Sequence, residues 1–479
     1  MKLEFKKDAL LNGINIVSKA IPSRTTMSIL ECILIDADAS EIKLTGNDME
    51  LGIETKVEGS ILERGKIALE AKLFYEIIRK LPDGETPVVI TSDNRFNTII
   101  ECENAVFNIQ GRDGEEFSYL PYIERDQHIS LTQFTLKEAI RQTIFSISPN
   151  DSNKMMAGEL LEVKDDFLKV VSLDGHRISI RNIQLKEHYD NHKVIVPGKT
   201  LSEISKILTG DNEKEVLIYF SKNHILFEFD DTVVVSRLID GEYFKIDHML
   251  SSDYETRVKL NKRDFMDNID RAMILIRDSD RKPIIMNVED NNVNMKVKSA
   301  FGSMNANVPA HKSGKDIMIA FNPKFLLDAL RVIDDEDVEL YMMNPKSPCF
   351  IKDEEGKKQY VVIPYGEYFR MRLAMLEYDD DDENDWEDIP YESDIYDNVG
   401  LPGKVCDIMH NENVSLQAAW RILRGMSQQE VAEKLGISQS AVSQLEALDS
   451  RPQKRTREKL AAIYGCTQEQ ISLYLPKEG

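Results

Sequence analysis

The chain combines two hydrophobic patterns, one typical of strands and one typical of amphipathic helices. Apolar and polar residues alternate through runs such as 215–229 and 292–298, which predicts half-buried β-strands. Three segments, 66–81, 193–208 and 316–333, begin with a short apolar strand pattern and continue with apolar residues at i, i+3, i+4 and i+7, as in a helix with one buried face. Many antiparallel strands with two helices per unit predict α+β domains whose helices cover one face of each sheet.

These patterns recur in three domain-sized units. Lys72, Lys199 and Lys324 hold matching positions, so the period is roughly 125 residues, far longer than the units of a solenoid. We therefore expect three repeated domains, a linker and a further domain. The predicted boundaries are 1–126, 127–252, 253–370, 371–400 for the linker, and 401–479.

A hairpin in the second unit carries two residues that its turn does not require. The strand-like runs 167–173 and 178–183 flank Asp174-Gly175, which is a strong short hairpin signal. His176 and Arg177 follow the glycine directly. Two interpretations are open: a solvated hairpin edge, or the wall of a recognition site.

Composition limits the classes of function. With 479 residues the chain needs more than one core, and no apolar run approaches the ~20 residues that span a bilayer. The five cysteines are scattered without a C-x-x-C pair, which indicates neither a zinc site nor a disulfide framework and favours a reducing cytoplasm. Pro197-Gly-Lys-Thr200 resembles the end of a P-loop but lacks the glycine five residues before Gly198. We expect no catalytic residue, metal or cofactor, and hence no enzyme.

The net charge of −23 comes from 83 acidic and 60 basic residues. This balance argues against a simple polycation that coats nucleic acid. It leaves contact with DNA open, because the local distribution of charge matters more than the total.

Residues 1–366 resemble the bacterial β sliding clamp, the processivity subunit of DNA polymerase III. The resemblance rests on the threefold repeat, on Leu173-Asp-Gly-His-Arg-Ile178, and on the order of further matching segments. These segments are Met27–Leu30 after Arg24, Leu44–Glu50, Gly111–Phe117, Leu120-Pro121, Val194–Pro197, Leu238–Gly241, Ile319–Asn322 and Tyr360–Pro364. The chain departs from the family after Pro364, where family members normally end within a few residues.

The resemblance implies a cytoplasmic, head-to-tail homodimer that closes a ring around duplex DNA. Helices would line the hole, and a clamp loader, DNA polymerase III and repair proteins would be the partners; no membrane is involved. By the same resemblance, Arg24 would meet DNA. Phe107 and Ile109 on one subunit would meet Ile274 and Leu275 on the other.

Partner proteins would dock in a pocket between the second and third units, with an apolar slot and a few polar groups. His176 and Arg177 would form its polar rim. The matching positions are Met156, Leu173, Gly175, His176, Arg177, Ile178, Phe244, Met249, Pro348, Val361, Val362, Ile363 and Pro364.

An acidic stretch follows the clamp-like part. After Tyr378, residues 379–388 are all Asp or Glu except Asn384 and Trp386. The composition is typical of a solvated, self-repelling linker. A second interpretation is a strip that mimics DNA or binds a partner through Trp386.

The last segment has the pattern of a helix-turn-helix. Ser427 and Glu430 form a capping box, Gly436 marks a tight turn, and a second helix is expected from Gln439. Residues 401–475 resemble Cro/C1-type (XRE) domains, including those of antitoxins. This resemblance implies a phosphate contact and base contacts in the major groove. The residues concerned are Gln428 for the phosphate and Gln439, Ser440, Ser443 and Gln444 for the bases.

Three functions remain open from the sequence. The first is a DNA polymerase processivity factor with a fused sequence-specific DNA-binding module. The second is a transcription regulator or antitoxin-like protein that uses a clamp-like scaffold, and the third is a join of two adjacent reading frames. Gln470–Leu475 is either the last helix of the module or a match to the short Gln-x-Ser-Leu-aromatic peptides that clamps bind.

Overall fold

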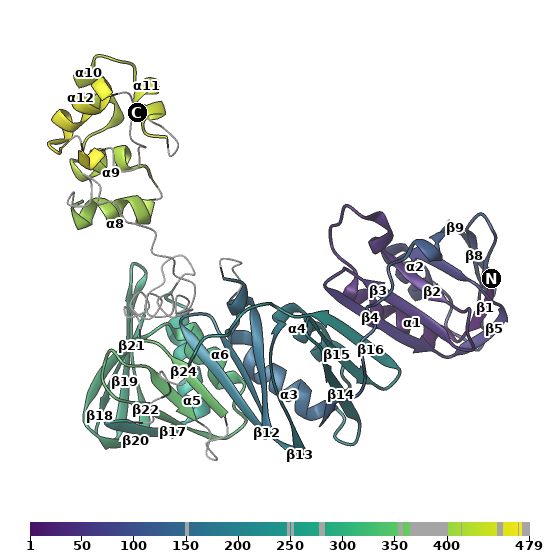
Figure 1. Ribbon diagram of the computed structural model, residues 1–479. Helices are drawn as coiled ribbons and strands as arrows, with labels where there is room; N and C mark the ends of the chain where they lie inside the picture. The colour runs from purple at the N-terminus through teal and green to yellow at the C-terminus, as the bar shows by residue number, and fades with distance from the viewer. Residues whose placement is uncertain are drawn as a thin grey trace. The chain divides into compact units, whose positions relative to one another are not determined.

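The computed structural model describes the chain except for residues 149–152, 247–249, 251–252, 277–282, 353–357, 365–400, 413, 448–453, 468 and 472–479. The chain forms two compact units, Met1–Asp381 and Asp382–Gly479, drawn as ribbons in Figure 1. The first unit contains three α+β repeats and the second is helical wherever it is described. Each unit is described by itself.

The three repeats share one order of elements: a strand, a helix, a run of strands, a second helix and closing strands. Repeat 1 contains β1 (Lys2–Phe5), α1 (Lys7–Val17), β2 (Cys32–Asp36), β3 (Ile42–Asn47), β4 (Leu51–Val57), β5 (Gly59–Glu63), β6 (Lys66–Glu70), α2 (Ala71–Lys80), β7 (Val88–Ser92), β8 (Asn97–Cys102), β9 (Ala105–Gln110) and β10 (Arg112–Asp113). Repeat 2 contains β11 (His128–Thr132), α3 (Gln133–Thr143), β12 (Gly158–Leu173), β13 (Arg177–Pro197), α4 (Gly198–Ile207), β14 (Glu215–Phe220), β15 (His224–Phe229) and β16 (Thr232–Arg237). Repeat 3 contains β17 (Thr256–Asn261), α5 (Lys262–Met273), β18 (Ile284–Glu289), β19 (Asn292–Ser299), β20 (Gly302–Gly314), β21 (Ile317–Phe321), α6 (Pro323–Arg331), β22 (Asp337–Met342), β23 (Cys349–Lys352) and β24 (Lys358–Val362). The predicted α+β class and threefold repeat are confirmed.

Short 3₁₀ helices connect several of these elements. In the first unit they are η1 (Ser18–Ala20), η2 (Ser28–Glu31), η3 (Gly114–Glu116), η4 (Ile144–Ser146) and η5 (Lys154–Ala157). η4 continues α3 directly, so that the end of this helix bends toward the β12–β13 hairpin, where Ser146 meets Ser179.

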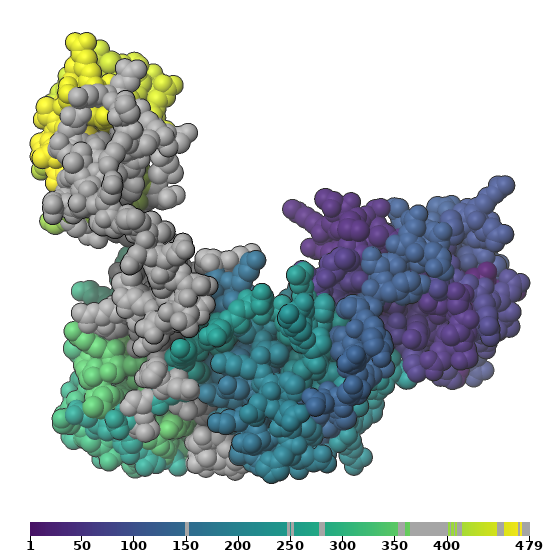
Figure 2. All heavy atoms as spheres, viewed as in Figure 1, coloured from purple at the N-terminus to yellow at the C-terminus, as the bar shows by residue number. Residues whose placement is uncertain are grey.

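Two of the three sheets run from one repeat into the next. The three strand orders are β5-β1-β7-β8-β9, then β10-β6-β2-β3-β4-β16-β15-β14-β11, and finally β12-β13-β24-β23-β22-β17-β20-β19-β18-β21. Repeat 1 joins repeat 2 through antiparallel pairing of β4 with β16, and repeat 2 joins repeat 3 through pairing of β13 with β24. In the space-filling view the colours of the first unit run from purple through blue and teal to green, in the order of the three repeats (Figure 2).

Each repeat places its two helices together against the sheets. The helices contact in the pairs α1 with α2, α3 with α4, and α5 with α6. In α2 the buried residues Phe74, Ile77 and Ile78 follow the i, i+3, i+4 spacing expected for a helix with one face in the core. Burial of each such side chain stabilises the fold by about 1.5–3 kcal/mol. No helix in the described part of the chain is long and apolar enough to cross a membrane.

The second unit is a helix-turn-helix module. Its elements are α8 (Gly403–Glu412), α9 (Leu416–Leu423), α10 (Gln428–Leu435), α11 (Gln439–Leu445), α12 (Lys454–Tyr464) and η8 (Glu469–Ile471). The predicted capping box is present, since Ser427 and Glu430 each accept a backbone N–H from the other. Gly436 has a φ of +72°, which a residue without a Cβ adopts freely, and the chain can therefore turn sharply into α11. Trp420 and Ile471 are buried in the module's core.

Candidate functional site

The predicted hairpin joins β12 and β13. Leu173 pairs with Ile178 at the end of the ladder. One carboxylate oxygen of Asp174 accepts the backbone N–H groups of His176 and Arg177, at 2.9 and 3.0 Å, and Gly175 supplies a φ of +83°. The turn chemistry inferred from Asp-Gly is therefore present.

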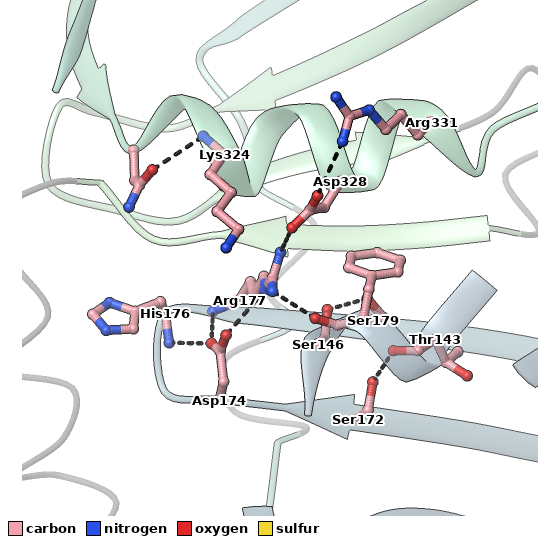
Figure 3. Close-up of polar contacts among 12 residues, drawn as sticks. Thr143, Ser146, Ser172, Asp174, His176, Arg177, Ser179, Lys324, Asp328 and Arg331 are labelled. Atoms are coloured by element: carbon pink, nitrogen blue, oxygen red, sulfur yellow. Dashed lines mark hydrogen bonds and ion pairs between the residues drawn. The ribbon is translucent and has the colours of Figure 1, made fainter. Parts of the chain in front are cut away.

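Arg177 is buried at the junction of repeats 2 and 3 (Figure 3). Its Nε donates to Asp174 at 3.0 Å and its Nη1 to Asp328 of α6 at 2.6 Å. Its guanidinium lies over the rings of Phe145 and Phe325, 5.2 and 4.8 Å from their centroids. Only 8% of the residue is exposed. Arg177 is therefore buried at this junction, and its role in the polar rim of a partner pocket stays a prediction.

A set of polar side chains lies buried beside this arginine. The hydroxyls of Ser146 and Ser179 are 2.5 Å apart, and Ser172 donates to the carbonyl of Thr143 at 2.5 Å (Figure 3). Glu159 is fully buried, and among the described residues neither of its carboxylate oxygens has a hydrogen-bond partner. Burial raises the pKa of Glu159 to about 8. Burial also raises the pKa of Asp174, and the charge of Arg177 offsets part of that second shift. We call Thr143, Ser146, Glu159, Ser172, Arg177 and Ser179 the polar corner.

An apolar cluster occupies the other side of the hairpin. Leu173, Ile178 and Val361 are buried in it, and Met156 and Phe244 are partly buried against it. Five of the predicted pocket residues therefore lie together. Their role in binding a partner stays a prediction.

The remaining predicted pocket residues lie in different surroundings. Val362 faces the core of repeat 3 because successive residues of β24 point to opposite faces. The backbone N–H of Ile363 donates to the carbonyl of His176 at 2.9 Å, and the His176 ring lies 5.1 Å from that of Phe325. Gly175 and Pro364 are buried, Pro348 is half-buried, and Met249 lies outside the described residues.

The predicted seam residues lie at two separate edges of the first unit. Phe107 and Ile109 are on β9, the last strand of its sheet, and Phe107 is 37% exposed. Ile274 and Leu275 follow α5 in repeat 3, and Ile274 is 81% exposed. Within one chain the two pairs pack against different cores, Ile109 with that of repeats 1 and 2 and Leu275 with that of repeat 3.

The predicted DNA-contacting residues are exposed except for one. Arg24 is exposed, and Gln439, Ser440, Ser443 and Gln444 are exposed on α11. Gln428 is half-buried at the start of α10, where its amide donates to Glu446 at 2.9 Å. Glu446 also accepts from Arg421 at 2.7 Å, so a buried ion pair fixes the position of Gln428.

Sequence reasoning missed Asp328, Phe325 and Glu159. A comparison of repeat 1 with repeat 2, position by position, would have pointed to Glu159. The buried residue Ile33 of β2 corresponds to Glu159 of β12, and Leu51 of β4 corresponds to Arg177 of β13. Ionisable residues at positions that are apolar in the sister repeat are a usable signal of a special site.

The fold and the junctions define a three-repeat DNA-clamp architecture with an appended helix-turn-helix module. The sequence models of the DNA polymerase III beta subunit match residues 1–121 (N-terminal domain), 130–245 (central domain) and 248–365 (C-terminal domain). A helix-turn-helix model matches residues 418–471. The chain belongs to the DNA polymerase III beta subunit family.

Known relatives match the first unit along nearly their whole length. The beta sliding clamp of Staphylococcus epidermidis is 33% identical over 380 residues, which is 77% of this chain and 100% of the relative. A crystal structure of a putative DNA polymerase III beta subunit from Eubacterium rectale is 63% identical, with a TM-score of 0.74 over 76% of this chain and 98% of that one. The sliding clamp of Bacillus subtilis is 30% identical, with a TM-score of 0.73 and the same coverage. The helix-turn-helix module is additional to these relatives.

Proposed function

We propose that the chain is a DNA sliding clamp, a non-catalytic processivity factor that closes as a homodimer around duplex DNA in the bacterial cytoplasm. Its helix-turn-helix module reads a DNA sequence. DNA polymerase III, a clamp loader and other clamp-binding proteins are the partners. We propose 1–126, 127–252 and 253–370 as the clamp domains, 371–400 as the linker and 401–479 as the module. The observation that carries this proposal is the pair of open strand edges described next.

Both junctions inside the chain use the same joint. At the first, core-facing Ile53 of β4 lies opposite Val234 of β16. At the second, Ser179 of β13 lies opposite Tyr360 of β24. The strands that correspond to these in the two end repeats are β20, which matches β4 and β13, and β9, which matches β16 and β24.

Each of these two strands has a free edge. β9 ends its sheet, and residues 302–309 of β20 pair only with β19 among the described strands. A third joint with the same register would bring Met304 opposite Phe107 of a second copy, and Gly302 opposite Ile109 of that copy. This register brings the exposed edge residues and Leu275, which lies close to Gly302, into one apolar seam. Two copies then close two identical seams.

The helices carry the charge needed to tolerate DNA. α1 to α6 contain thirteen Lys and Arg against eight Asp and Glu, a net charge of +5 in a chain of −23. A helix-lined hole would therefore be positive while the remainder repels nucleic acid. Encirclement needs only such sequence-independent contacts with phosphates, to which exposed Arg24 would add.

Seam formation is tested with Phe107→Asp in the full chain. We expect the dimer dissociation constant to rise at least about 30-fold, because a charge replaces a central apolar contact in both seams. Phe167→Asp is the matched control, since Phe167 is 47% exposed on β12 and lies outside the proposed seam. Light scattering across a dilution series gives the constants, and equal values for the two variants would contradict the seam.

Encirclement is tested on DNA topology. The chain is loaded onto a nicked circular duplex with a bacterial clamp loader, and the circle is then cut with a restriction enzyme. We expect the protein to stay on the circle and leave the linear product, because a closed ring is retained by topology alone. Equal release from both forms would refute a sliding clamp.

Sequence reading by the module is tested by selection from random duplexes. We expect an enriched sequence whose preference falls by about 1–3 kcal/mol per lost base contact in Gln439→Ala and Ser443→Ala. Gln429→Ala, an exposed change on α10, is the control. No enriched sequence, or one that survives both changes, would exclude specific readout by α11.

A further inference from the structure

We infer that Arg177 is a positioning residue, which fixes the partner-binding hairpin (residues 173–178) against α6 of repeat 3 without touching the partner. This rests on the proposed function, because it concerns how the pocket of a clamp is held. It differs from the sequence expectation, in which the arginine would meet the partner directly.

The guanidinium has little capacity left for a partner. Its three nitrogens donate to Asp174, to Asp328 and to the carbonyl of Phe145. Phe145 and Phe325 both lie within cation–π distance of it. Its side chain is 10% exposed and that of Asp328 is 18% exposed. A peptide could reach this charge only by displacing contacts that are already made.

The same contacts determine the shape of the turn. One oxygen of Asp174 accepts the two backbone N–H groups that close the turn, while the other oxygen accepts Nε of Arg177. Arg177 also donates to Asp328 and thereby attaches the turn to α6 (Figure 3). The ring of His176 rests near Phe325 of the same helix. The hairpin is therefore held in place from repeat 3, although it belongs to repeat 2.

A second arginine provides a matched comparison. Arg141 of α3 also joins repeats 2 and 3, through Asp334 at 3.2 Å, and pairs with Glu138 of its own helix. Arg141 thus bonds to Glu138 and Asp334, whereas Arg177 bonds to Asp174 within the hairpin. If only the docking of the repeats mattered to partner binding, loss of either arginine would have the same effect.

The experiment measures the binding of a fluorescein-labelled Gln-Leu-Ser-Leu-Phe peptide to the full chain by anisotropy. We expect Arg177→Ala to weaken binding by more than about tenfold, since the slot is no longer preorganised. Arg177→Lys restores part of the affinity, because lysine keeps the charge but lacks the planar fork. Asp328→Asn weakens binding by about fivefold, whereas Arg141→Ala stays within about twofold of wild type.

Each alternative has its own outcome. Unchanged or stronger binding in Asp328→Asn with loss in Arg177→Ala would mean that the arginine serves the peptide directly, and would overturn the inference. Equal losses in Arg177→Ala and Arg141→Ala would reduce the effect to docking of the repeats and also overturn it. No binding to the wild-type chain would refute the pocket itself, and circular dichroism of each variant shows whether the fold is retained.

Discussion

Repeats 1 and 2 have the same fold but opposite chemistry at one corner. Where repeat 1 buries apolar side chains, repeat 2 buries the polar corner. The corresponding pairs are Val17 and Thr143, Ala20 and Ser146, Ile33 and Glu159, Leu51 and Arg177, and Ile53 and Ser179. The same backbone is therefore built in repeat 1 with apolar residues at these five positions.

We expect the polar corner to fix the geometry of this junction rather than to add stability. A buried ion pair is commonly no more stabilising than well-packed apolar residues of similar size, because desolvation offsets the attraction. Networks of hydrogen bonds do, however, fix one arrangement of side chains. The corner lies where the partner hairpin meets repeat 3, and geometry there would matter more than stability.

The largest expected effect comes from removing one partner of the ion pair. Arg177→Ala leaves Asp174 without its cation and Asp328 with only the more distant Arg331, 3.8 Å away, and should lower the free energy of unfolding by about 3–5 kcal/mol. Arg177→Leu combined with Asp328→Asn makes this junction resemble the one at Leu51. We expect the double variant to regain part of the loss in urea denaturation, because Asp328 no longer carries a charge while Asp174 still lacks its cation and keeps only its two backbone donors. A double variant as unstable as Arg177→Ala would show that the two junctions are not equivalent.

The apolar junction of repeat 1 is tested at Leu51, the residue that corresponds to Arg177. It is 1% exposed, and Leu51→Ala should cost about 3 kcal/mol through lost burial and a residual cavity. Partner-peptide affinity should not change, because the residue lies at the other junction. Differential scanning calorimetry and the anisotropy titration measure the two quantities, and a coupled loss of affinity would undermine the division of roles between junctions.

Glu159 should make the stability of repeat 2 depend on pH. Ile33, at the matching position of repeat 1, has no ionisable group and should have no such effect. The pKa of Glu159 is about 8 in the folded chain against an ordinary 4.5, so the folded state holds the proton more tightly. The contribution of the protonated Glu159 to the free energy of unfolding is complete below pH 4.5 and is lost as the pH rises toward 8. Between pH 5 and 8, the free energy of unfolding of Glu159→Gln should therefore rise relative to that of wild type, by roughly 2 kcal/mol at pH 8. This value is smaller than the full pKa difference implies, because water penetration eases the ionisation of buried carboxyls.

Urea denaturation at several pH values checks this expectation. Glu162→Gln on the same strand is the control, since Glu162 is half-buried. A difference between Glu159→Gln and wild type that does not change with pH would exclude a neutral, buried carboxyl.

The smallest effect is expected at the serine pair. Ser146→Ala leaves the buried hydroxyl of Ser179 without its partner and should cost about 1 kcal/mol. Changing both serines to alanine should cost no more than the single change, since no hydroxyl is then stranded. A thermal shift assay compares the three proteins, and a strictly additive double variant would argue against the pairing.

Much of this architecture follows from local sequence signals. The Asp174-Gly175 turn, the capping box at Ser427 and the αL glycine at 436 act over a few residues, so the sequence predicts them directly. The threefold repeat predicted the α+β class. Contacts between repeats could not be predicted in this way, because Asp328 lies far from Arg177 in sequence and its helix shows an ordinary amphipathic pattern.

The same limit explains why the burial of Arg177 was not predicted. Phe325 and Asp328, which help to bury it, come from another repeat, and the sequence beside the Asp-Gly turn gives no sign of them. The placement of Val362 was missed for a related reason. Strand alternation puts Val361 and Val362 on opposite faces, but which face meets the hairpin depends on the pairing of β13 with β24.

The joint that β4 and β16 make, and that β13 and β24 repeat, has a mechanical consequence for a ring. Within the chain each joint is tethered, so its two strands meet at an effective concentration in the millimolar range. The proposed third joint, between β20 and β9 of different copies, would have no tether and would depend on the protein concentration. A ring built from six near-identical joints thus has two predetermined breaking points, and a force that opens it would act there first.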